Sequence, residues 1–213
     1  MSLVLGHIHY WLYDQIKVVE DREVEVVDAF KEKYGQDVEG IASKVREEYG
    51  ELKGDTPLED LIGESHIHPW LEGAISTAQS REAALVRELK DKYDDQELLV
   101  DTYRRNGAAV AQEGLKEIKS NDLRTAFELL KNTLVERMPC DRLSAVVKSE
   151  EDIIVWRHDI KLHIEFWKAA QAPVELMHQL YSNWIESFIT TVNPEIKHER
   201  KVLADQYEDI FTI

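Results

Sequence analysis

The sequence predicts an all-α fold, a bundle of about six helices with an internal helical-hairpin repeat and room for one small β-hairpin near residues 143–156. Glycine and proline are scarce, with 9 and 5 among 213 residues, which favours helices joined by short connections. Apolar residues recur at spacings of three and four along most of the chain, the pattern of amphipathic helices. We expect one helical domain over residues 1–213.

The repeat is the strongest signal within the chain. The segment His7–Leu12 returns as His66–Leu71, and the ungapped alignment continues to Tyr34 and Tyr93 with 12 of 28 positions identical. Each copy therefore predicts a long amphipathic helix with the same apolar face. The first copy of the hairpin covers residues 7–62, the second covers 66–137, and a C-terminal part covers 143–213.

One acidic residue interrupts the apolar face of each copy, Glu23 in the first and Glu82 in the second. We expect each carboxylate to form a salt bridge with a basic residue of a facing helix, because a buried charge needs a partner. The alternative is a carboxylate-rich site in the middle of the bundle.

The remaining elements follow from turn and capping signals. Further helices are expected over residues 38–52, from 96 to 119, from 121 to 134 and from 174 to the stop at Asn193-Pro194, with a short turn at 58–62. Residues 143–156 fit either a β-hairpin or the start of a helix, and we favour a hairpin followed by a helix capped near Asp159. A last helix is expected over residues 202–211.

Paired histidines begin both copies of the repeat. Pro69 disfavours helix at His68, so we expect both His-x-His segments to be extended, with their two imidazoles side by side at a helix N-terminus. Parallel first helices would bring both pairs to one end of the bundle. Imidazole suits Fe, Zn, Ni or Cu, of which Fe and Zn are favoured here. The alternative is that these histidines cap helices and form hydrogen bonds across the duplication.

A shortened third copy of the motif, His163–Trp167, adds a histidine and a carboxylate. The complete set of expected metal ligands is His7, His9, His66, His68, His163 and Glu165.

Other motifs are weaker. Glu175/His178 and Glu195/His198 resemble the Glu-x-x-His motifs of ferritin-like di-iron bundles, but no companion glutamates can be assigned. His158-Asp159 resembles the His-Asp pair of HD-type metal phosphohydrolases, although the nearest upstream histidine is too far away for that pattern. Cys140 is a lone thiol in an expected loop, with no neighbouring base evident.

Bulk composition limits the partners. The formal net charge of −16 disfavours binding to nucleic acid or to an anionic membrane, and it attracts cations. No apolar run is long enough for a transmembrane helix, and no signal peptide is recognisable at the start. A single cysteine cannot form an internal disulfide, which indicates a cytoplasmic protein.

The leading functional hypothesis is therefore a transition-metal site at the histidine-rich end of the bundle, with a catalytic or sensory role. The alternative is a non-enzymatic helical protein, such as a chaperone or scaffold, that binds a protein partner.

Overall fold

The computed structural model describes residues 5–137 and 141–213, which form eight α-helices and one four-stranded antiparallel sheet. The expected all-α bundle is wrong, because 13% of the chain is strand beside 63% helix. The helices are α1 (His7–Tyr34), α2 (Asp37–Tyr49), α3 (Leu58–Ile62), α4 (Ile67–Tyr93), α5 (Gln96–Gly114), α6 (Leu123–Thr133), α7 (Ile164–Ala169) and α8 (Val174–Val192). None of the described helices is both long and apolar enough to cross a membrane.

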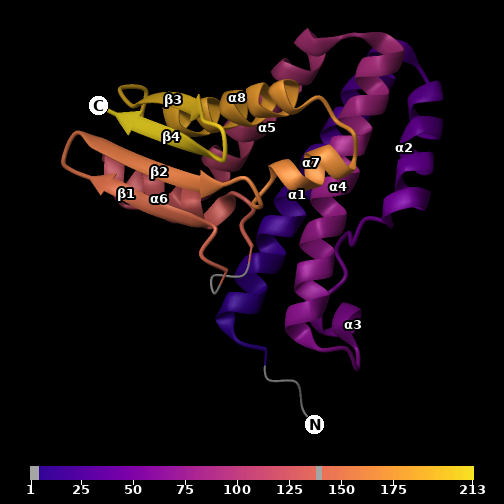
Figure 1. Cartoon of the computed structure of the whole chain (residues 1–213), viewed down its shortest axis with the longest axis horizontal. Helices are drawn as coiled ribbons and strands as arrows, with labels where there is room; N and C mark the ends of the chain where they lie inside the picture. Colours follow the sequence, from indigo (N-terminus) through magenta and orange to yellow (C-terminus); the bar gives the residue numbers. More distant parts are fainter. Residues whose placement is uncertain (1–4, 138–140) are drawn as a thin grey trace.

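The repeated helices α1 and α4 lie side by side and parallel (Figure 1). Residues related by the repeat meet at both ends of the pair. His9 Nε2 lies 3.3 Å from His68 Nε2 at the start, and the rings of Tyr34 and Tyr93 stack at 4.2 Å between centroids at the end. The sequence repeat is therefore a structural repeat with an approximate twofold axis between the two helices.

The two hairpins are interlocked. Helix α2 packs against α4 of the other copy, and α5 packs against α1. Each second helix thus covers the first helix of the opposite copy, so the two copies share one core. That core continues into the C-terminal half, where it includes Trp156, Trp167, Trp184 and Phe211. A second, smaller core surrounds Leu12 and Leu71 at the histidine end of the bundle.

The C-terminal half contains the sheet. Strands β1 (Ser144–Ser149), β2 (Ile153–Asp159), β3 (Lys197–Val202) and β4 (Gln206–Thr212) have the order β1-β2-β4-β3. Helices α6 and α8 cover one face of this sheet (Figure 1). The hairpin expected at residues 143–156 is present as β1 and β2, but it belongs to a larger sheet, and the helix that follows begins only at Ile164.

The helix expected over residues 202–211 is wrong, since this region is the end of β3 and most of β4. Along β4 the buried positions alternate as Tyr207, Asp209 and Phe211. The middle member of this alternation is a carboxylate, and the inward side chains of β3 are His198 and Arg200. Polar side chains at inward positions hide the period of two that identifies a strand.

Candidate functional site

The four histidines of the repeat do not converge on one point. Helix α1 begins at His7 and α4 begins at Ile67, so His7 and His9 lie in a helical turn rather than an extended segment. Side chains two positions apart on a helix point about 200° away from each other. As a result His9 is buried with 8% exposure, whereas His7, His66 and His68 are exposed. The expected extended approach to the helices is wrong, except that His66 is an extended N-cap.

The hydrogen bonds of His9 define its tautomer. Its Nδ1 accepts a hydrogen bond of 3.0 Å from the backbone N–H of Gly6, so the ring proton of the neutral imidazole is on Nε2. That Nε2–H donates to His68 Nε2 at 3.3 Å. A metal-binding histidine instead uses a bare nitrogen on the metal and donates its other N–H to an acceptor. The contact therefore has the chemistry of an imidazole hydrogen bond.

The other two expected ligands lie elsewhere. His163 caps α7 and is fully buried, and Glu165 is exposed on the same helix. In residues 5–137 and 141–213, no three His, Cys, Asp or Glu side chains are grouped so that they could hold a metal ion. In the two Glu-x-x-His motifs, Glu175 and Glu195 are exposed, whereas the side chains of His178 and His198 are buried. Cys140 lies outside the described residues.

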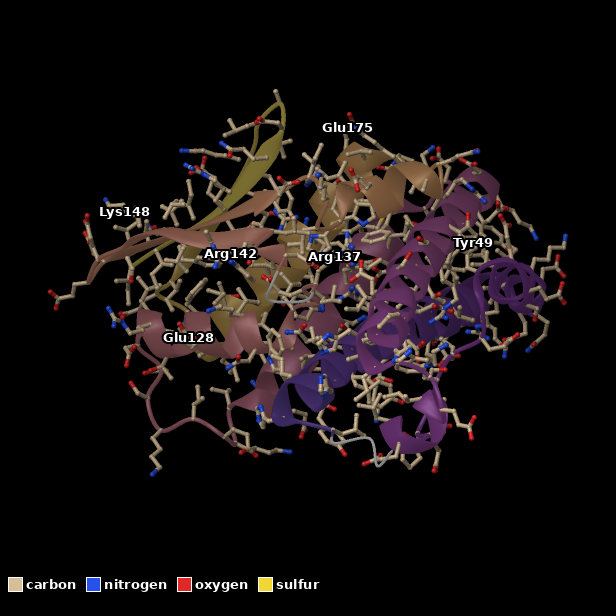
Figure 2. The ribbon with its side chains drawn as sticks, turned by 60° about the horizontal axis from the view of Figure 1, so that its bottom comes forward. Tyr49, Glu128, Arg137, Arg142, Lys148 and Glu175 are labelled. Carbon is tan, nitrogen blue, oxygen red and sulfur yellow. The ribbon has the colours of Figure 1, made fainter. Side chains whose placement is uncertain are left out.

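A cavity of about 430 Å³ lies where the helical repeat meets the C-terminal half. Three separate segments line it, namely the start of α1, the end of α6 with the residues that follow, and the start of β1. Its walls are His7, Ile8, Trp11, Lys131, Asn132, Glu136, Arg137, Arg142, Leu143 and Ser144. Arg137 and Arg142 lie at this junction of helices and sheet (Figure 2). Junctions of this kind are common places for small-molecule sites.

Buried side chains fix the end of α6 and the residues that follow it, which form one wall of the cavity. Gln15 of α1 accepts a hydrogen bond from the Glu136 N–H at 3.0 Å, and its amide donates to the carbonyls of Lys131 and Asn132 at 3.4 Å. From the other side, His163 Nε2 donates to the carbonyl of Val135 at 3.2 Å. A segment without regular structure is therefore fixed by two side chains that are at most 1% exposed.

Glu136 is the one acidic side chain among the lining residues. Both of its carboxyl oxygens lie 2.8 Å from the Ser144 hydroxyl, which donates to them. Burial raises the pKa of Glu136 to about 7, against the opposing effects of the Ser144 hydrogen bond and of Lys131. A carboxyl group with this pKa can hold or release a proton near neutral pH.

The basic side chains of the cavity are not neutralised by Glu136. Arg137 forms its ion pair with Glu72 of α4, and its guanidinium lies over the ring of Phe166. Within the described parts of the chain, neither Lys131 nor Arg142 forms an ion pair. Arg142 also has a left-handed backbone (φ 52°), a conformation that costs a non-glycine residue about 1 kcal/mol. Positive charge therefore gathers here on a chain whose net charge is −16.

Behind this wall lies a buried cluster of polar rings. The hydroxyl of Tyr207 donates to His163 Nδ1, and the ring of His158 stacks on Tyr207 at 4.6 Å. The carboxylate of Asp209 accepts two hydrogen bonds of 2.8 Å from Arg200. Burial alone would raise the pKa of Asp209, but Arg200, His158 and His198 hold this pKa well below its usual value.

Three histidines of this cluster, His158, His163 and His178, have lowered pKa values. His198 Nε2 lies 2.7 Å from Asp209, whereas His158 Nε2 approaches it to 3.1 Å without the alignment of a hydrogen bond. Burial lowers the pKa of both His158 and His163, and it lowers the pKa of His178 to about 4. The cluster joins β2, β3 and β4 to the helices, so we assign it a structural role.

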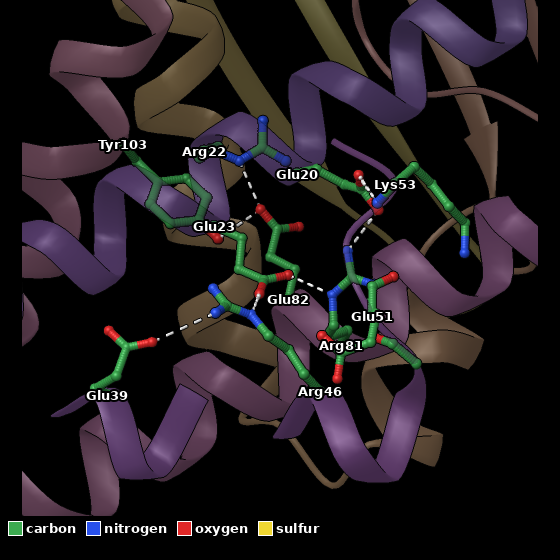
Figure 3. Close-up of polar contacts among 11 residues, drawn as sticks. Glu20, Arg22, Glu23, Glu39, Arg46, Glu51, Lys53, Arg81, Glu82 and Tyr103 are labelled. Carbon is green, nitrogen blue, oxygen red and sulfur yellow. Dashed lines mark hydrogen bonds and ion pairs between the residues drawn. The ribbon is translucent and has the colours of Figure 1, made fainter. Parts of the chain in front are cut away.

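A network of ion pairs fills the middle of the repeat (Figure 3). Arg22 Nε donates to Glu82 at 2.6 Å, and the repeat-related Arg81 Nε donates to Glu23 at 2.6 Å. The expected salt bridges of Glu23 and Glu82 are thus confirmed. Because arginine side chains fill the space between the carboxylates, the alternative of an open carboxylate site does not fit.

Sequence reasoning did not find the cavity. Its lining comes from segments that lie far apart in the chain, and no spacing rule connects Trp11, Lys131 and Ser144. A weak signal was present in Leu134-Val135-Glu136, where a carboxylate follows two buried apolar residues. Comparison with protein-family models, curated protein sequences and solved structures gave no match.

Proposed function

We propose that the chain binds a small organic anion that has a flat apolar part, in the cavity between α1, α6 and β1. The observation that carries this proposal is the composition of the walls. Three basic side chains and one carboxyl group surround an apolar surface formed by Ile8, Trp11 and Leu143. Binding sites for small molecules combine an apolar lining with a few polar groups in the same way.

The charge pattern selects an anion over a cation. Lys131 and Arg142 have no ion-pair partner among residues 5–137 and 141–213, so their charges are available to a ligand. Arginine in particular forms bidentate bonds with carboxylates and phosphates. With the Glu136 carboxyl group protonated, no negative side chain of the lining opposes an anion.

The apolar part of the ligand is assigned to Trp11. This indole is half-buried in the cavity wall, and its buried Nε1–H has no hydrogen-bond partner among the described residues. A planar ligand group can stack on the exposed part of the ring. The volume of about 430 Å³ suits a molecule of one or two rings.

Titration with three matched probes tests the proposal: naphthoate, the neutral naphthamide and the cationic naphthylmethylammonium. Binding is measured by quenching of Trp11 fluorescence, and Trp11→Phe identifies the part of the signal that comes from this residue. We expect naphthoate to bind at least about tenfold more tightly than the cation, which corresponds to ~1.4 kcal/mol. Equal affinity for the three probes, or no binding, would contradict the proposal.

A matched pair of variants on α6 locates the effect. Lys131→Gln removes a cavity cation, whereas Arg124→Gln removes an exposed cation near the other end of the same helix. Naphthoate affinity should fall about three- to tenfold in the first variant and stay within error in the second.

Transition-metal binding by Fe, Zn, Ni or Cu is the second candidate. One observation favours it, the His9–His68 Nε2 separation of 3.3 Å, which is the distance between two ligand nitrogens around a tetrahedral ion. The proton on His9 Nε2 opposes it. Elemental analysis of protein purified without a histidine tag tests this candidate. A stoichiometric metal that is lost in His9→Ala/His68→Ala would support it, and a stoichiometric metal kept in that variant would place the ion elsewhere.

A further inference from the structure

Within residues 5–137 and 141–213, few protein groups donate hydrogen bonds to the half-buried carboxyl group of Glu136, which lines the cavity. An ionised carboxyl group has about four lone-pair sites, yet the one side-chain donor that reaches Glu136 in the described residues is the Ser144 hydroxyl. A single hydroxyl hydrogen serves one oxygen at a time, although both oxygens lie 2.8 Å from it. A protonated carboxyl group needs fewer donors than a carboxylate and offers a donor of its own to a ligand in the cavity.

Within the described residues, the charged and titratable groups near Glu136 form no side-chain hydrogen bond with its carboxyl group. Lys131 acts on it through space without forming an ion pair, Arg137 is bound to Glu72, and Arg142 and His7 line other parts of the cavity. Further inside the protein, the hydroxyl of Tyr207 donates its hydrogen bond to His163.

We propose that the cavity takes up one proton with each organic anion, and that Glu136 holds this proton and donates it in a hydrogen bond to the ligand's anionic group. This inference rests on the proposed function of the cavity. An anion next to an ionised Glu136 would be repelled, whereas a protonated carboxyl group contributes a donor where Lys131 and Arg142 contribute charge.

The sign of the pH dependence follows from the protonation state. Burial raises the pKa of Glu136 to about 7, so the free cavity carries the proton below that pH and has lost it above. Binding of an anion above that pH must first restore the proton. Naphthoate affinity should therefore be constant at low pH and fall by about tenfold for each pH unit above about 7.

Titration calorimetry with naphthoate between about pH 6 and pH 9, in buffers that differ in ionisation enthalpy, measures the protons taken up for each ligand bound. We expect uptake to approach one proton at the upper end of this range. Glu136→Gln keeps the shape and a donor without a titratable group, so it should bind naphthoate with the low-pH affinity throughout and take up no proton. Glu165→Gln, an exposed carboxylate on α7, should behave like the wild type.

His7 is the other group of the cavity that could take up a proton, so His7→Gln is compared as well. Proton uptake that persists in Glu136→Gln and disappears in His7→Gln would overturn the assignment to Glu136. NMR titration of the side-chain carboxyl carbon of Glu136 without ligand gives a separate result. An ordinary pKa for this group overturns the inference even if naphthoate binds, whereas a failure of naphthoate to bind at any pH overturns the proposed function and this inference with it.

Discussion

Arg22 and Glu82 form a fully enclosed ion pair of the repeat, since each side chain is 2% exposed. The hydroxyls of Tyr103 and Tyr181 also donate to the carboxylate of Glu82, at 2.9 and 2.7 Å. Burial alone would lower the pKa of Arg22, but Glu82 raises it, so the guanidinium stays charged. Losing one partner would leave this charge uncompensated in the core.

Glu82→Gln should therefore lower the free energy of unfolding by about 3–5 kcal/mol, measured by urea denaturation at neutral pH. Glu88→Gln on the same helix is the control, because Glu88 pairs with Arg87 at the surface and is 45% exposed. We expect the control to change stability by less than ~1 kcal/mol. A similar loss of unfolding free energy in both variants would contradict a particular role of the buried pair. If the double replacement Arg22→Met/Glu82→Met recovers stability, the loss in Glu82→Gln comes from the uncompensated charge of Arg22.

At the level of single residues, the salt bridges of Glu23 and Glu82 could be inferred from the sequence, because a carboxylate on an apolar helix face requires a basic partner. The tautomer of His9 could not be inferred in this way. It depends on the N–H of Gly6, which is available only because the helix begins at His7.

Among the elements, α5 and α8 pack against each other most extensively, and Gly107 permits their close approach. A Cβ atom at this position would lie 2.5 Å from the carbonyl oxygen of Trp184, a backbone atom that cannot turn away. The side chain of Trp184 also donates a hydrogen bond of 2.7 Å to Asn106, so the two helices are held together beside this glycine.

Gly107→Ala should destabilise the fold by about 1–3 kcal/mol, because the added methyl group forces α5 away from α8. Gly40→Ala is the matched control, since Gly40 is also within a helix but an added methyl group there would meet no atom within 4 Å. At this position the alanine should stabilise the helix by about 0.5–1 kcal/mol. Thermal unfolding measures the stability of both variants against the wild type. A stabilising effect of Gly107→Ala would contradict the close contact of α5 and α8.

The helices were predictable from apolar periodicity and capping signals, whereas strands β3 and β4 were not. Asp209, His198 and Arg200 occupy inward positions that a strand normally fills with apolar residues. Their burial is compensated by mutual ion pairs and hydrogen bonds across neighbouring strands, and this pairing becomes visible only when β3 and β4 lie together.

On the scale of the whole molecule, the repeat places α1 beside α4, but the cavity depends on the C-terminal half. Trp11 comes from the first copy, Lys131 from the last helix of the second copy, and Ser144 from the sheet. A prediction made from one segment at a time therefore finds the histidines of each copy and misses the cavity between segments. The gathering of basic side chains on an acidic chain is likewise a property of the folded molecule.

NMR chemical-shift changes in isotope-labelled protein titrated with naphthoate show directly where the anion binds. The indole N–H of Trp11 and the amides of Asn132, Leu143 and Ser144 should show the largest shifts, because these residues line the cavity. The equivalent indole of Trp70 is the internal control and should remain unchanged, since it packs beside Tyr13 on the other copy. Shifts that are largest around Trp70 or scattered over the surface would contradict a ligand site at the junction of α1, α6 and β1.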